Sequence, residues 1–128
     1  MENVDDWKVK ALANQQRKLT IHLSGFLPRE EMYSLTDQLR RSCRSVCANI
    51  AEAYAKRRYP AHMVSKLTDA DGENAETRVW LEAILECGYI STNDIDPVLD
   101  LNMQINRLLN YMMIHREKFA LKTDPKGK

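Results

Sequence analysis

The sequence predicts an all-α protein, an up-down-up-down bundle of four helices. Apolar residues recur at intervals of three and four along most of the chain, which is the period of one helix face. Four glycines and four prolines among 128 residues are too few for a fold rich in tight turns. Short breaks separate the periodic stretches, as expected for helices that pack beside their neighbours in the sequence.

The first helix is predicted over residues 4–24, and Leu12, Leu19 and Leu23 occupy apolar positions in it. Gly25 suits the position after a helix, and Pro28 ends or restarts helical structure. The second helix is predicted over residues 29–58, ahead of a break at Pro60. Its apolar residues are spaced by four, four, three, four and three: Leu35, Leu39, Cys43, Val46, Ile50 and Ala53.

The third helix is predicted over residues 61–86, where Gly72 weakens the middle and leaves room for close helix approach. Cys87-Gly88-Tyr89-Ile90 is typical of a helix C-terminal cap with a hydrophobic contact. Ser91-Thr92-Asn93-Asp94 supplies N-cap candidates for a fourth helix over residues 94–119. Residues 1–120 therefore form one predicted bundle domain, and residues 121–128 a flexible polar tail.

The composition and the charge distribution of the chain limit the classes of function that it can have. The net charge of +1 does not favour a globally basic nucleic-acid binder. The charge is uneven, however, because residues 29–58 carry a net +3 and residues 59–88 a net −4. The chain has neither a leader pattern nor an apolar run near the ~20 residues of a membrane span. With three cysteines, an odd number, the sequence predicts free thiols and a cytoplasmic setting.

Motifs for catalysis and metal binding are missing from the sequence. No His follows a Glu by three residues, so the di-iron bundle pattern is excluded. No zinc motif, phosphate-binding glycine loop or nucleophile elbow occurs. Cys43 and Cys47 lie one helical turn apart, but two thiols on the small, apolar side of a helix are more simply buried than metal-bound. We therefore expect no cofactor, no metal and no enzyme activity.

A basic stripe lies beside the apolar face of the second helix. At 100° per residue, Arg44, Arg58, Tyr33 and Tyr54 all fall within about 40° of Arg40, and Arg41, Lys56 and Arg57 add charge nearby. Arginine binds phosphate bidentately and tyrosine stacks on unpaired bases. The predicted contacts to RNA or DNA are Arg40, Arg41, Arg44, Arg57, Arg58, Tyr33 and Tyr54.

A second interpretation uses the same arginines structurally. They can pair with the acidic third helix, either within the bundle or across a subunit boundary. The spacing alone favours this structural or interface use over nucleic-acid binding. In that case the protein is an interaction scaffold, in which the basic helix of one subunit faces the acidic helix of the next.

Residues 35–41 (L-T-D-Q-L-R-R) and 45–52 (S-V-C-A-N-I-A-E) resemble the signature of a four-helix-bundle family. Its members include proteins encoded in intervening sequences of large-subunit ribosomal RNA genes. Two further stretches fit the same pattern: residues 26–28 (F-L-P), which precede the second helix, and residues 107–110 (R-L-L-N). The resemblance therefore covers roughly residues 7–118. The chain departs from it at four positions: Cys47 replaces a proline, Ala53 and Ala55 replace glycines, and Arg44 adds a charge.

Residues 64–71 and 80–81 are also similar to the accessory variability determinant of diversity-generating retroelements. That protein is a related bundle that assembles as a pentameric barrel and binds nucleic acid and a reverse transcriptase. The resemblance implies a homopentameric ring, a nucleic-acid partner and, for a retroelement protein, a reverse transcriptase as partner. It implies no enzyme activity, since the family has none established.

Overall fold

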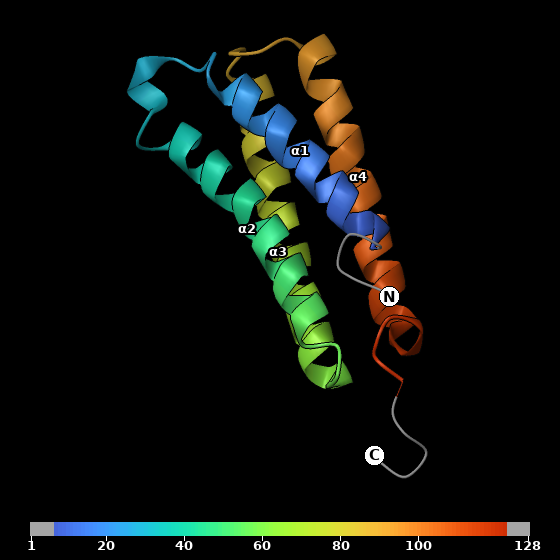
Figure 1. Ribbon diagram of the computed structural model, residues 1–128. Coiled ribbons are helices and arrows are strands. Elements are labelled where there is room, and N and C mark those ends of the chain that lie inside the picture. Colours follow the sequence, from blue (N-terminus) through green and yellow to red (C-terminus); the bar gives the residue numbers. More distant parts are fainter. Residues whose placement is uncertain (1–6, 123–128) are drawn as a thin grey trace.

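The protein is described by a computed structural model that covers residues 7–122 (Figure 1). Four helices and no strand form this part of the chain. They are α1 (Lys8–Ser24), α2 (Leu35–Ala55), α3 (Pro60–Glu86) and α4 (Thr92–Ile114). Two short 3-10 turns accompany them, η2 (Arg29–Glu31) and η3 (Arg116–Lys118).

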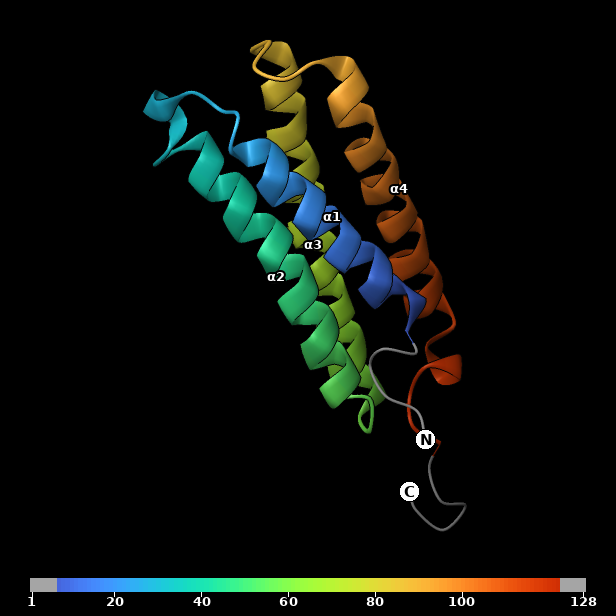
Figure 2. The same cartoon turned by 45° about the horizontal axis from the view of Figure 1, so that its top comes forward.

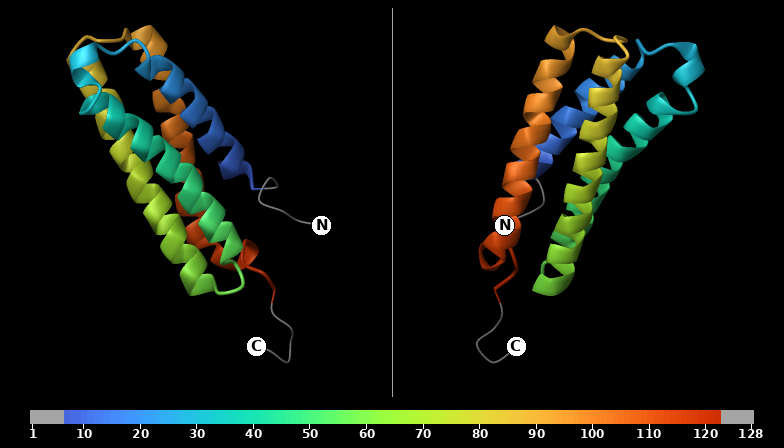
Figure 3. Two further views of the ribbon diagram at one scale, coloured as in Figure 1. Left: turned by 60° about the vertical axis from the view of Figure 1, so that its left-hand side comes forward. Right: turned by 180° about the vertical axis from the view of Figure 1, so that it is seen from behind.

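Each helix packs against the next one in the sequence, and α1 also packs against α4. In Figure 2, α1 lies in front, between α2 and α4, with α3 behind. The loops at residues 25–34 and 87–91 lie together at one end of the molecule, which we call the loop end (Figures 1 and 3). The α2–α3 turn at residues 56–59 and the segment 115–122 lie at the opposite end, the turn end.

Two hydrophobic clusters form the core, one toward each end. The turn-end cluster contains Trp7, Val9, Ala13, Val46, Ile50, Ala53, Met63, Leu67, Ala70, Ile105, Leu109 and Met112. The loop-end cluster contains Leu23, Leu35, Leu39, Leu81, Ile84, Ile90, Ile95 and Val98. All six apolar positions predicted for the second helix are buried, so the predicted core stripe of α2 is confirmed.

A layer of buried polar side chains separates the two clusters. Gln16 of α1 donates from Nε2 to Oδ1 of Asn74 at 3.1 Å, and Asn102 of α4 donates from Nδ2 to Oε1 of Gln16 at 2.9 Å. Asn74 and Asn102 also exchange bonds with each other's backbone carbonyls at 3.0 and 2.9 Å. These mutual bonds satisfy amides that burial would otherwise leave unpaired at a cost.

The predicted second helix, residues 29–58, is too long at both ends. Pro28 begins the separate turn η2, and Ser34 adopts φ −125° and ψ −98°, which no helix tolerates. At the other end α2 stops at Ala55, and Lys56 leaves the helical region with φ −100° and ψ 12°. The residue before Pro60 is also driven out of that region. Tyr59 accordingly has φ −117° and ψ 96°.

The other boundaries differ less. Helix α1 begins at Lys8, and predicted residues 4–6 lie outside the described part, as do residues 123–128 of the predicted tail. Helix α3 begins at Pro60, which suits the first helical position because proline lacks an N–H. Helix α4 begins at Thr92, where the Ser91 hydroxyl accepts from the Asp94 N–H at 3.3 Å, and it ends at Ile114 rather than 119.

The predicted cap at the end of α3 is confirmed. Gly88 has a φ of +71°, and the Tyr89 N–H donates to the carbonyl of Ile84 at 3.2 Å. The prediction that Gly72 allows close helix approach is wrong, because no atom lies within 4 Å of the position that a Cβ would take.

Candidate functional site

Arg40 and Arg41 are neighbours in α2, and both are engaged with other helices. Arg40 is half-buried, and its Nε donates to the Ser24 hydroxyl at the end of α1 at 2.8 Å. The guanidinium of Arg41 contacts Glu73 of α3 at 3.2 Å and also Glu76. These bonds to Glu76 and Glu73 raise the pKa of Arg41. The positive charge of Arg41 is therefore compensated by carboxylates of the same subunit.

Arg57 and Tyr54 form a second engaged pair. The Arg57 guanidinium carbon lies 3.7 Å from the centroid of the Tyr54 ring, and its Nη1 donates to the Tyr54 carbonyl at 2.9 Å. The Tyr54 ring also packs edge-on against Trp7, with centroids 5.1 Å apart. Tyr54 therefore stands in the aromatic packing of the turn end, where one of its faces is covered by Arg57.

Arg44, Arg58 and Tyr33 are exposed, and Tyr33 is 90% accessible. Within residues 7–122, neither Arg44 nor Arg58 makes a side-chain hydrogen bond or ion pair. The predicted single column is wrong in its geometry, because Tyr33 precedes α2 and Arg58 follows it. A helical angle of 100° per residue has no meaning for residues outside the helix.

The structure brings further cations to Arg57 and Arg58 that the sequence pattern missed. The Leu121 N–H donates to the Arg57 carbonyl at 2.9 Å, so the segment after α4 lies against the α2–α3 turn. Arg116, Lys118 and Lys122 belong to that segment. These cations lie almost 60 positions later in the chain, which is why no local spacing rule could find them.

The predicted acidic surface of α3 is largely engaged inside the subunit. Besides the contacts of Glu73 and Glu76 with Arg41, Asp69 lies 3.6 Å from Lys66 on the same helix. Lys66 in turn lies 3.4 Å from Glu52 of α2. Arg78 lies 3.4 Å from Glu82 on the same helix. The opposite charges of the second and third helices therefore meet within one bundle, between α2 and α3.

Burial disfavours the thiolate form of both cysteines of α2. Burial raises the pKa of Cys43 to about 11, and burial also raises the pKa of Cys47. The Cys43 Sγ donates to the Arg40 carbonyl at 3.4 Å. Across residues 7–122 no three His, Cys, Asp or Glu side chains gather closely enough to hold a metal ion.

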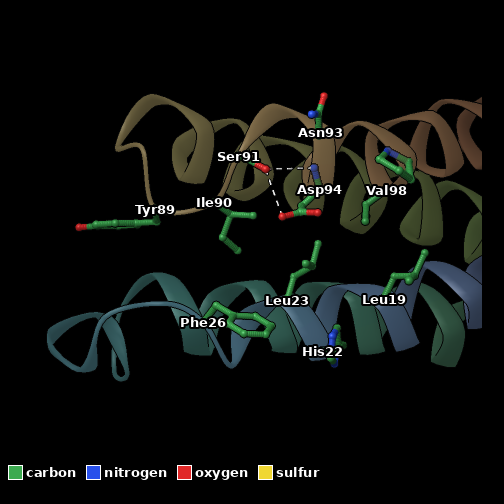
Figure 4. A pocket seen from close by; sticks show the side chains of 11 residues that line it. Leu19, His22, Leu23, Phe26, Tyr89, Ile90, Ser91, Asn93, Asp94 and Val98 are labelled. Atoms are coloured by element: carbon green, nitrogen blue, oxygen red, sulfur yellow. Dashed lines mark hydrogen bonds between the residues drawn. The ribbon is translucent and has the colours of Figure 1, made fainter.

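A cavity of about 510 Å³ opens at the loop end, between α1 and the start of α4 (Figure 4). Leu19, Leu23 and Val98 lie along it, with His22 and Phe26 on the α1 side. The Ser91 hydroxyl beside it is committed to capping α4 through its bonds with Asp94. None of the predicted site residues lines this cavity.

Comparison with known proteins places the chain in a family. A model of the 23S rRNA-intervening sequence proteins matches residues 5–111. The chain belongs to this family. As a 23S rRNA-intervening sequence protein it is also similar to a solved structure from Bacteroides thetaiotaomicron, described as a protein of unknown function from the S23 ribosomal protein family.

That structure superposes with a TM-score of 0.75 at 29% identity, over 83% of this chain and 95% of the other. The family and the four helices expected from the sequence are thus confirmed. No curated protein matches the chain. None of the helices described for this family member is long and apolar enough to cross a membrane.

Proposed function

We propose that this 23S rRNA-intervening sequence protein is a non-enzymatic, oligomeric four-helix bundle that binds RNA through exposed arginines. The observation that carries the proposal is the pair Arg44 and Arg58, which are exposed without an intramolecular partner among residues 7–122. Arginines without internal partners are free to bind phosphate oxygens bidentately. Tyr33 is the most exposed aromatic candidate for stacking on an unpaired base.

Arg40, Arg41 and Arg57 have supporting roles in this proposal. Each makes a defined contact, to Ser24, to Glu73 or to the Tyr54 ring. Their charges therefore add to the positive electrostatic potential while the side chains stay in place. The half-buried Tyr54 ring packs against the Arg57 guanidinium and helps to fix its position. The non-enzymatic part is supported by Cys43 and Cys47, whose thiolates are disfavoured by burial, and by the capping role of Ser91.

We further propose an up-down-up-down topology and a homopentameric ring. The topology is supported by the loop positions, with two loops at the loop end and the α2–α3 turn at the opposite end (Figure 3). The ring is implied by the resemblance to the pentameric retroelement accessory protein. Native mass spectrometry tests the assembly, and a monomer at micromolar concentration would contradict it.

The alternative function is a scaffold in which the basic helix pairs with the acidic helix of a neighbouring subunit. The contacts of Arg41 with Glu73 and Glu76 favour RNA binding over this scaffold, because those carboxylates are already paired within the subunit. A scaffold of this kind also predicts that high salt dissociates the assembly and that nucleic acid does not bind.

The binding test uses the double variant Arg44→Ala/Arg58→Ala and a structured RNA hairpin at low salt. We expect weaker binding and a salt dependence whose log–log slope is shallower by up to about 2, because two phosphate contacts are lost. Fluorescence anisotropy over a salt series measures both quantities. Arg40 is left intact, because removing its bond to Ser24 would make a loss of RNA binding indistinguishable from a loss of stability.

The matched control is Lys18→Ala/Arg107→Ala, which removes the same charge from exposed positions on α1 and α4. The control retains binding if the arginines act locally. Equal losses in the two variants, or no RNA binding by the parent protein at low salt, would contradict the proposed function.

A further inference from the structure

Besides the opposite charges of α2 and α3, the segments at the two ends of the bundle differ in charge. Residues 56–58 and 116–122 at the turn end contain six basic residues and one acid, Glu117. Residues 25–34 and 86–96 around the loop end contain five acids and one basic residue, Arg29. The segments at the two ends of the described bundle therefore carry opposite net charges, +5 at the turn end and −4 at the loop end.

Packing fixes the two basic segments of the turn end against each other. The Phe119 ring lies edge-on to Trp7, with centroids 6.1 Å apart, and edge-on to Tyr111 at 6.2 Å. The Ala120 N–H donates to the Arg116 carbonyl at 2.9 Å, which closes the turn after η3. With the bond from Leu121 to the Arg57 carbonyl, these contacts hold the segment across the end of the bundle.

The cations of this surface are accessible. The bond to Tyr111 raises the pKa of Lys118, and Glu117, the one acid in these segments, raises it further. Five of the six are exposed and Arg57 is half-buried. No ion pair within residues 7–122 includes any of the six, and the one acid, Glu117, lies 4.0 Å from His115. The Lys118 ammonium donates to the Tyr111 hydroxyl at 3.0 Å, which fixes its position without removing its charge. The six are Lys56, Arg57, Arg58, Arg116, Lys118 and Lys122.

Aromatic side chains lie next to these cations. Tyr59 is 57% exposed in the α2–α3 turn, and its ring centroid lies 5.6 Å from that of His62. Tyr111 is 41% exposed beside Lys118. Cationic groups and exposed rings on one surface match the phosphates and the base faces of an unpaired strand.

We propose that the turn end, built from the α2–α3 turn and the segment 116–122, is the surface that binds the phosphate backbone of RNA. This inference rests on the proposed function, keeps Arg58 as a shared contact and adds the cations of residues 116–122. The RNA crosses the end of the bundle instead of following α2. Arg58 belongs to the binding surface, whereas Arg44 on the side of α2 is peripheral to it.

The deciding experiment uses the variant Arg116→Ala/Lys118→Ala/Lys122→Ala. It removes three cations that RNA binding along the side of α2 would not require. Its matched control is Lys18→Ala/Arg29→Ala/Arg107→Ala, which removes the same charge from exposed positions elsewhere. A third variant, Arg44→Ala, reports on the side of α2. Far-UV circular dichroism verifies that all three are folded, and anisotropy measures binding to an RNA hairpin and to single-stranded DNA of the same length.

We expect the turn-end variant to lose RNA affinity by at least about tenfold at low salt and to lower the salt slope by about 2 to 3. The control and Arg44→Ala should lose much less. Equal losses for turn-end variant and control, or a larger loss for Arg44→Ala, would overturn the inference while leaving RNA binding by the protein intact.

Absence of binding by the parent protein would instead remove the proposed function and the inference together. Sedimentation with vesicles of anionic lipid forms a second arm. Binding to vesicles by a protein that ignores RNA would assign the turn end to a membrane surface and overturn the proposal. Tighter binding to the DNA strand than to the RNA hairpin would identify unpaired bases as the preferred partner, which supports the surface and changes its substrate.

Discussion

At the scale of single residues, the carboxylate of Glu31 connects the two loops of the loop end. It accepts a bond from the Ser34 hydroxyl at 2.6 Å and one from the Tyr89 hydroxyl at 2.8 Å. The bonds from Ser34 and Tyr89 lower the pKa of Glu31, and the bond to Glu31 raises the pKa of Tyr89 to about 12. The fold therefore prefers an ionised Glu31 beside a protonated Tyr89.

Replacing Tyr89 by Phe should reduce stability in a pH-dependent manner. A lowered carboxyl pKa stabilises the fold above the unfolded-state pKa, and this gain disappears as pH falls through the lowered folded-state value. The raised Tyr89 pKa gives the converse, a gain that is present below the ordinary tyrosine pKa and is lost as pH rises through about 12.

Urea unfolding of both proteins from about pH 7 to about pH 3 checks this prediction. The stability difference between parent and Tyr89→Phe should shrink toward acid pH. A difference that is constant over this range would mean that the Glu31 contact carries no linked proton.

The same scale explains why the site was only partly predictable. Arg40, Arg41 and Arg44 look alike in the sequence, yet one contacts Ser24, one contacts α3 and one is exposed. Which of them meets a partner depends on the side chains of other helices. Spacing in one helix places a residue on a face, but it cannot say what lies opposite.

At the scale of elements, helix interiors followed from the sequence, whereas both ends of α2 and the end of α4 did not. The apolar spacing of α2 placed its core residues because burial of one face is a local, periodic requirement. The break before α2 lies at Ser34, and the segment ahead of it is bonded through Glu31 to Tyr89, 58 positions away, a contact that no local pattern contains. Both ends of α3 were predictable from the sequence, because Pro60 and Gly88 act through their own backbone preferences.

The two glycines of α3 and its cap should respond oppositely to the same substitution. Gly72 lies exposed in the helix with open space around it, so Gly72→Ala should stabilise the protein by up to about 1 kcal/mol. Gly88 has a φ of +71°, so Gly88→Ala should destabilise it by about 1–2 kcal/mol.

Each variant serves as the control for the other in thermal and urea unfolding. A loss of stability in Gly72→Ala would indicate that this exposed face of α3 packs closely against another subunit. That outcome would identify part of the oligomer interface.

At the scale of the whole molecule, the polar layer between the two cores aligns three helices. Gln16, Asn74 and Asn102 satisfy one another only in one axial register, because a shift of one helix by a turn separates the amides by about 5 Å. Apolar side chains of the two clusters tolerate such shifts better, since hydrophobic contact is not directional. The sequence offered no sign of this layer, as its members are 28 to 86 positions apart.

Asn102→Ala should therefore destabilise the bundle by about 2 kcal/mol or more, because Gln16 and Asn74 would keep buried groups without partners. Asn110→Ala on the same helix is the control, since the Asn110 side chain is exposed and bonds only the Asn106 carbonyl among described residues. Urea unfolding measures both, and equal stabilities would show that water can replace the network.

The positions of the cysteines matter for anyone who attaches a probe to this protein. Trp7 packs with Phe119 at the turn end, so both ends of the described part of the chain lie close to the cations proposed to bind RNA. Cys87 lies exposed beside the opposite loop, whereas Cys43 is buried and Cys47 is half-buried. A maleimide dye should therefore react first at Cys87, which gives a native labelling position far from the basic surface and leaves that surface untouched.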